Sequence, residues 1–228
     1  KNIDAIYLDC GGVSAGFATL DALRTALTEF KASGKKIYSY GDFYTTGDYF
    51  VASCADSVFM NPEGSISLQG ITGTIPYMKG LFDKLGIRFQ FVKVGTFKSA
   101  VEPYIMEEMS EPARAQLDTL YGNIWSYLKE KMASSRGIQP SDISRLINTD
   151  FVMFAAPQTA VKGKLIDKLV PGRRMKESLA SLVGKDPEKL NFVSPEFMTS
   201  QTDWGTSYSE KNQIAVLYAT GEISETAE

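Results

Sequence analysis

Short β-favouring segments alternate with helical spacings in the first part of the chain, and this alternation restricts the fold more than any other feature. Apolar residues recur at helical spacing from Leu20 to Phe30, and residues 45–54 can form a second helix. The strand candidates around these helices are Ile3–Leu8, Lys36–Tyr40 and Ser57–Met60. Each is followed by a turn or junction that contains glycine or proline, and residues 61–64 stop the last of them. Strand–helix–strand units repeated in this way predict an α/β fold with a largely parallel sheet.

The rest of the chain is mostly helical in pattern. The predicted elements are a short β-like piece at Ser65–Leu68, a strand at Arg88–Val92, helices at Pro76–Leu85, Glu111–Arg136, Ser141–Ile147, Pro157–Lys162 and Arg174–Val183, and a loop-like stretch over 187–209. Gln213–Ala219 then reads as a buried strand close to the last residue. We therefore expect one domain over residues 1–212 and the start of a second over 213–228.

Composition excludes several classes of function. The 228 residues carry a formal net charge of −3 and no basic stripe, so nucleic-acid binding is not expected. No apolar run approaches the roughly 20 residues of a membrane span, and we expect any membrane anchor of the natural protein to lie outside this sequence. The chain contains no histidine, which rules out a Ser-His-Asp triad, a Cys-His dyad and a histidine-ligated zinc site built from these residues alone. For Cys10 and Cys54, free thiols in apolar surroundings are favoured over a disulfide.

Two turns have both a chemical and a structural interpretation. Gly11-Gly12 follows a strand and precedes a helix, so it can offer backbone N–H groups to an anion, but a tight connection that needs positive φ is favoured. In the stretch GDFYTTGDY, Thr45 or Thr46 can be a hydroxyl nucleophile or a helix cap. A threonine with no adjacent base is a poor nucleophile, so capping is favoured.

A lysine in a segment of small and apolar residues is the third candidate. Lys98 lies in the string VGTFKSAVEP. If it packs into a dry cleft, its ammonium loses solvation and the pKa of its amine falls, which makes it a usable general base. The alternative for any single lysine is an ordinary solvated surface charge.

Several strings in order along the chain together resemble one family. They are GDFYTTGDYFVAS, SVFMNPEGSISLQG, PYMKGLFDKLGI, VGTFKSAVEP, the Met109–Arg114 run and the terminal QIAVLYATGEI. The chain is similar in these to the first repeat of the signal peptide peptidase A family (peptidase family S49) in its long, two-repeat form. VGTFKSAVEP is the most specific of them and resembles the family's general-base segment.

The resemblance implies a Clp/crotonase-like α/β fold of stacked β-β-α units with a helical insertion, and a serine peptidase with a Ser/Lys dyad. It assigns the general base to Lys98, whose amine Thr96 and Ser99 can hydrogen-bond, and it places the nucleophilic serine in a second repeat beyond this chain. At the corresponding first-repeat position the chain has Thr46 where the active pattern has serine, so no catalytic role is assigned to it. The mechanism that the resemblance implies needs no metal or cofactor.

The same resemblance implies substrates, partners and a location. The substrates are apolar remnants of signal peptides, and the partners are the second repeat and further copies of the chain in a homo-oligomer. The location is the periplasmic face of the bacterial inner membrane.

Two other functions fit the same pattern. One is an acyl-CoA hydratase or isomerase on the crotonase-like scaffold, which uses carboxylates and backbone donors and has no need of Lys98. The other is a non-catalytic repeat that only builds an oligomeric shell. Thr46 at the nucleophile position supports this interpretation, and Lys98 in its specific segment argues against it.

Overall fold

The sheet of this protein has four strands in the order β1-β2-β3-β4, all parallel, in a computed structural model that describes residues 3–149 and 155–197. The strands are β1 Ala5–Cys10, β2 Lys36–Tyr44, β3 Ser57–Ile66 and β4 Lys168–Leu169. The α-helices are α1 Phe17–Ala32, α2 Thr46–Ala52, α3 Lys79–Lys84, α4 Glu102–Ile105, α5 Glu111–Arg136, α6 Pro140–Thr149, α7 Pro157–Lys162 and α8 Met175–Val183. Three short 3₁₀ helices are η1 Ser99–Val101, η2 Gly172–Arg174 and η3 Pro187–Lys189.

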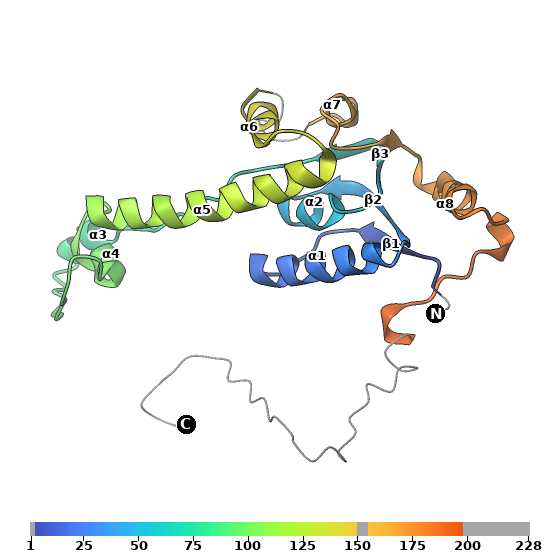
Figure 1. Cartoon of the computed structure of the whole chain (residues 1–228). Helices are drawn as coiled ribbons and strands as arrows, with labels where there is room; N and C mark the ends of the chain where they lie inside the picture. Colours follow the sequence, from blue (N-terminus) through green and yellow to red (C-terminus); the bar gives the residue numbers. More distant parts are fainter. Residues whose placement is uncertain (1–2, 150–154, 198–228) are drawn as a thin grey trace, which may run out of the picture. The chain divides into compact units, whose positions relative to one another are not determined.

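The α/β class with a parallel sheet is confirmed, and strands and helices alternate singly from β1 to β3 (Figure 1). Helix α1 forms because Leu20, Arg24 and Leu27 recur at helical spacing on one side, and all three are buried. Helix α2 is short but buried almost entirely, from Asp48 to Ala52. A short helix held on all sides gives its first turn a fixed position, and that turn is one of the candidate sites.

Strand β3 is longer than its sequence predicts, which corrects the expected stop at 61–64. The strand continues to Ile66, so the separate β piece expected at 65–68 belongs partly to it. Between the pairs Gly41↔Met60 and Phe43↔Ser65 the register of β2 and β3 shifts. A Cβ on Gly64 would lie 2.3 Å from the carbonyl oxygen of Asp42, so only glycine allows the two backbones this close approach.

The strand expected at Arg88–Val92 does not form, and these residues are irregular and exposed. Phe89 and Phe91 are 42% and 46% exposed, and Val92 is 93% exposed. β-favouring side chains fit a strand, but a strand also needs a neighbour to pair with. None of the described residues forms a ladder with this segment.

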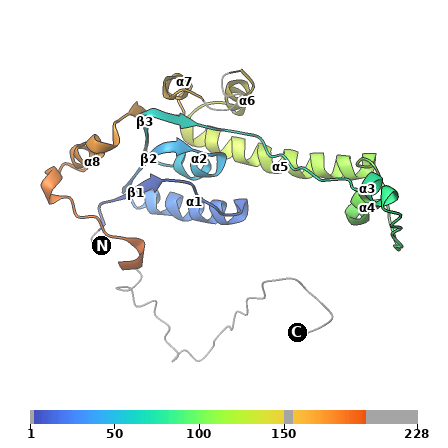
Figure 2. The same cartoon turned by 180° about the vertical axis from the view of Figure 1, so that it is seen from behind.

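Helix α5 is the longest element and begins and ends where its sequence predicts. Ser110 caps its first turn by accepting a hydrogen bond from the Ala113 N–H (3.3 Å), and Gly137 ends it in the left-handed conformation at φ 64°. Its 26 residues give a length of about 39 Å. Its C-terminal half packs near α2, whereas α3 and α4 lie beside its N-terminal end, away from the strands (Figures 1 and 2). Helices α6, α7 and α8 also form where expected, within one or two residues.

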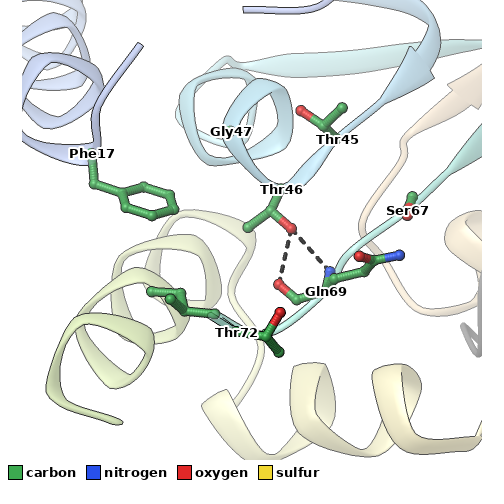
Figure 3. Close-up of a pocket in the computed structure, with 9 residues that line it drawn as sticks. Phe17, Thr45, Thr46, Gly47, Ser67, Gln69 and Thr72 are labelled. Atoms are coloured by element: carbon green, nitrogen blue, oxygen red, sulfur yellow. Dashed lines mark hydrogen bonds between the residues drawn. The ribbon is translucent and has the colours of Figure 1, made fainter. Parts of the chain in front are cut away.

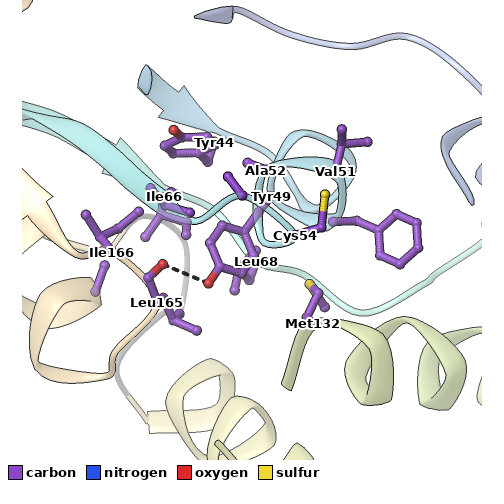
Figure 4. Close-up of a cluster of buried hydrophobic side chains, with 14 of the residues drawn as sticks. Tyr44, Tyr49, Val51, Ala52, Cys54, Ile66, Leu68, Met132, Leu165 and Ile166 are labelled. Atoms are coloured by element: carbon purple, nitrogen blue, oxygen red, sulfur yellow. Dashed lines mark hydrogen bonds between the residues drawn. The ribbon is translucent and has the colours of Figure 1, made fainter. Parts of the chain in front are cut away.

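The hydrophobic core lies around α2 and the middle of the sheet (Figure 4). Tyr49 is fully buried there, and its hydroxyl donates a 2.8 Å hydrogen bond to the carbonyl oxygen of Leu165. Tyr44, Ile66 and Met132 are also fully buried and belong to the same cluster. This core joins β2, β3, α2 and α5 and the loop after α7.

The chain divides into two units, residues 1–188 and 189–228. Everything described below belongs to the first unit. The strand expected at Gln213–Ala219, and with it the domain boundary expected at 212/213, lies outside the described residues. Within the residues that are described, no helix has the length and apolar composition needed to cross a membrane.

Candidate active site

Thr45 caps α2 with a complete capping box, as its sequence predicts. Its hydroxyl accepts a hydrogen bond from the Asp48 N–H (3.2 Å) and donates one to Asp48 Oδ2 (2.7 Å), while the Thr45 N–H donates to the same carboxylate (3.1 Å). The other carboxylate oxygen of Asp48 accepts from the Val13 N–H at 2.7 Å. The buried Asp48 therefore ties the start of α2 to the loop after β1.

Thr46 does not cap α2, because Thr45 fills that position, and a structural role for Thr46 stays a prediction. The Thr46 hydroxyl bonds the backbone of Gln69 twice, donating to its carbonyl oxygen (3.0 Å) and accepting from its N–H (2.9 Å) (Figure 3). Its proton is already donated to the Gln69 carbonyl oxygen, and none of the described residues offers it a base, so within this part of the chain the hydroxyl is not arranged as a nucleophile. Its role is to hold the chain that leaves β3 against the first turn of α2.

A pocket of about 380 Å³ opens at this turn (Figure 3). It is lined by Phe17, Thr45, Thr46, Gly47, Ser67, Gln69, Gly70, Ile71 and Thr72. These side chains offer hydroxyls, an amide and apolar surface, but no amine, carboxylate or imidazole. Without a general base the pocket provides no means of activating a hydroxyl.

The Gly11-Gly12 turn is the tight connection favoured by its sequence. Gly12 has φ +98°, which a residue with a side chain rarely adopts, and it leads directly to Val13. The Val13 N–H is already used by Asp48. The turn therefore serves the packing of α2 against β1.

Lys98 lies elsewhere in the unit, immediately before η1 and α4. Its backbone N–H bonds the carbonyl oxygen of Gly95 (3.4 Å) in a turn where Gly95 has φ +97°. Its side chain is exposed, and it makes no hydrogen bond or ion pair with any residue that the structure describes, Thr96 and Ser99 included. It is not among the residues that line the Thr46 pocket. The described residues alone thus do not form the dry cleft that was expected around the Lys98 amine.

The backbone that carries Lys98 is held by a buried carboxylate that the sequence pattern did not single out. Glu102 is fully buried, and it accepts hydrogen bonds from Lys93 Nζ (3.0 Å), from Ser110 Oγ (2.8 Å) and from the Ser110 N–H (3.2 Å). Burial opposes its ionisation, but the hydrogen bonds from Lys93 and Ser110 outweigh burial and lower the pKa of Glu102 below its usual value. The sequence around Glu102 gave no signal of this burial, since neither α4 nor the contact with Ser110 was expected.

Both cysteines are free thiols, as favoured from their surroundings. Burial raises the pKa of Cys10 to about 11 and also raises the pKa of Cys54. A thiol with a raised pKa is a weak nucleophile at neutral pH. Over residues 3–149 and 155–197, no group of three or more Cys, Asp or Glu side chains is placed to hold a metal ion.

Comparison with known proteins identifies the family. The model of peptidase family S49 matches residues 29–185. Among individual relatives, Protease 4 of Haemophilus influenzae is 30% identical over 92% of this chain and 35% of its own length. Protease 4 of Salmonella typhi is 28% identical over 100% and 38% of the two chains, and the chloroplastic serine protease SPPA of Arabidopsis thaliana is 27% identical over 97% and 33%. The chain therefore spans little more than a third of the length of these relatives.

The solved structures that align with this chain share little sequence with it. An enoyl-CoA hydratase/isomerase family protein from Silicibacter pomeroyi aligns over 80% of this chain and 63% of its own, with TM-score 0.43 and 12% identity. A membrane-bound stomatin-specific protease aligns over 77% and 69%, with TM-score 0.40 and 14% identity.

Proposed function

Because this chain belongs to peptidase family S49, we propose that it supplies the general base of a serine peptidase that works through a Ser/Lys dyad. Lys98 is that base, and the nucleophilic serine lies outside residues 1–228. The observation that carries this proposal is the family match over residues 29–185, which includes Lys98 and the string VGTFKSAVEP around it. The Lys98 amine is exposed and has no hydrogen-bonding or charged partner among the described residues, so it is free to meet a serine from outside them. The histidine-free sequence and the engaged Thr46 hydroxyl support the same assignment.

The chemistry follows from a neutral amine beside a serine hydroxyl. The Lys98 amine takes the serine proton as the serine oxygen attacks the scissile carbonyl carbon, and backbone N–H groups stabilise the oxyanion. The resulting Lys98 ammonium then gives its proton to the leaving amine as the C–N bond breaks, which leaves an acyl-enzyme. Water hydrolyses the acyl-enzyme, with Lys98 acting again as the base.

To act as a base, the Lys98 amine must be neutral, and the apolar residues before it in the sequence can favour the neutral form. Phe97 is 61% exposed, Val94 79% and Val92 93%, so the segment on the N-terminal side of Lys98 presents apolar surface to its surroundings. When the rest of the protein covers this surface, the Lys98 amine loses solvation, which favours its neutral form. The covering parts are the second repeat and neighbouring copies in a homo-oligomer.

The substrates we propose are apolar, extended peptides such as remnants of signal peptides. An apolar cleft around Lys98 suits such peptides, since burial of their side chains drives binding. Such substrates also favour action at the membrane, on the periplasmic face of the bacterial inner membrane. The S49 match favours this function over acyl-CoA chemistry, which has no use for Lys98.

The test is hydrolysis of an apolar fluorogenic peptide by the full-length protein. Lys98→Met should lower kcat/KM by about 10²–10⁴, as expected for loss of a positioned base. Lys98→Arg should not restore activity, because a guanidinium stays protonated. Lys84→Met, at an exposed lysine in the last turn of α3, is the matched control and should behave as wild type. Near-normal cleavage by folded Lys98→Met protein would refute the assignment.

A further inference from the structure

The segment that carries Lys98 is held at its C-terminal end by Glu102, the first residue of α4. This carboxylate is fully buried and satisfies three donors at once, two of them on Ser110. Ser110 is also the residue that caps α5. One buried side chain thus joins the lysine segment to the start of the longest helix.

Further contacts fix the same small region. The Met78 N–H before α3 bonds the Pro103 carbonyl oxygen at 2.7 Å, and Phe89 stands 4.7 Å from Phe82 and 5.3 Å from Tyr104 between ring centroids. Aromatic pairs at these separations add to the burial of their surfaces. The ring contacts of Phe89 and the hydrogen bonds of Glu102 and Pro103 therefore fix the chain before and after the exposed stretch that contains Lys98.

The two lysines of this segment have different surroundings. Lys93 forms the ion pair with Glu102, and its side chain is 26% exposed. Lys98, five residues later, has no carboxylate partner among the residues described. A carboxylate against Lys98 would stabilise its ammonium form by charge attraction, which is the opposite of what a base needs.

We propose that Glu102 is a positioning residue for Lys98. It orients the Lys98 backbone by binding Ser110, and it directs its own charge to Lys93 rather than to the catalytic amine. This inference rests on the proposed function of Lys98, and Glu102 itself touches neither substrate nor the reacting atoms.

The experiment compares Glu102→Gln and Ser110→Ala with wild type in the full-length protein. All folded sites are first labelled to completion with a serine-directed acylating inhibitor, so that slowly and rapidly acylated sites are both counted, and kcat is then expressed per labelled site. We expect kcat per site to fall about 10–10²-fold in Glu102→Gln, since small misplacements of a reacting group cost this much. Ser110→Ala keeps the buried carboxylate and should fall less, and KM should change less than threefold in both.

A purely structural role would lower the thermal unfolding midpoint and the number of labelled sites, but it would leave kcat per labelled site unchanged. Asp83→Asn is the matched control, because Asp83 pairs with Lys79 on the exposed side of α3 in the same region. It should leave kcat per site at the wild-type value.

The possible outcomes distinguish the positioning role of Glu102 from the proposed function of Lys98. Wild-type kcat per site in Glu102→Gln, together with an inactive Lys98→Met, would overturn the positioning role alone. An active Lys98→Met would overturn the proposed function and this inference with it. A decrease in Glu102→Gln that Asp83→Asn does not share supports the inference.

Discussion

Replacing Thr46 by valine tests whether the first turn of α2 is structural or catalytic. Valine has nearly the shape of threonine, so the substitution removes the hydroxyl and little else. Two hydrogen bonds are lost, both to the backbone of Gln69, at 3.0 and 2.9 Å. The change therefore isolates what the hydroxyl contributes.

The magnitude follows from those two bonds and their exposure. A hydrogen bond contributes a net of about 0.5–1.5 kcal/mol, which gives about 1–3 kcal/mol for the pair. Gln69 is exposed, so water replaces the lost partners and the cost should be at the lower end, about 1 kcal/mol. For a unit of this size the unfolding midpoint should fall by roughly 2–4 °C.

Thermal unfolding and peptide hydrolysis by the full-length protein measure both consequences. We expect kcat/KM to stay within about twofold of wild type. Thr45→Val is the matched neighbour, because it breaks the capping box around the buried Asp48 and should cost about 0.5–2 kcal/mol. A Thr46→Val protein with wild-type stability but no turnover would refute the structural interpretation.

Three further predictions concern the hydrogen bonds of the buried Arg24, the loss of stability at acid pH and the activity of the isolated chain. Arg24 donates hydrogen bonds to the carbonyl oxygens of Phe50 and Lys131, so Arg24→Met should lower the free energy of unfolding in urea by about 2–4 kcal/mol, and a loss below 1 kcal/mol would contradict this role. Burial opposes ionisation of Asp56, but bonds from the Ile37 N–H (2.9 Å) and Lys36 (3.0 Å) lower its pKa, so its contribution to stability is present above about pH 3.9 and is lost as pH falls further. In urea unfolding measured over a series of pH values, Asp56→Asn should remove that part of the pH dependence. The same loss of unfolding free energy at acid pH in this variant would count against the role of Asp56. The isolated chain should hydrolyse no apolar peptide, and hydrolysis that disappears in Lys98→Ala would mean that a nucleophile lies within these residues.

Local patterns were enough to predict the parallel sheet and most helices, because each depends on nearby residues. Helix α5 is an example, since Ser110 at its start and Gly137 after its end both act within one turn. The same is true of the capping role of Thr45. The α/β class followed from the strand–helix alternation before any tertiary contact was known.

The features that the sequence predicted wrongly all depend on contacts with residues far away along the chain. Strand β3 passes through the turn-like residues 61–64 because Gly64 packs on the Asp42 backbone, a contact with another strand. Arg88–Val92 has the composition of a strand but no neighbour among the described residues. Thr46 bonds a residue 23 positions away. Such contacts leave no local signal in the sequence.

The candidate site was predictable only in its residue type and segment. The string GTFKSA singled out Lys98, and the role of its amine stays a prediction. Glu102 drew no attention in the sequence, because its burial and its bonds to Ser110 depend on a contact across the turn between α4 and α5.

The most direct test of the dyad is to label the full-length protein with a serine-directed acylating reagent and locate the label by peptide mass spectrometry. We predict a single labelled serine outside residues 1–228, with labelling slowed at least about 10²-fold by Lys98→Met, because the base that activates the serine is gone. Label on Thr46 or any other residue of this chain, or an unchanged labelling rate in Lys98→Met, would contradict the assignment of Lys98 as the base.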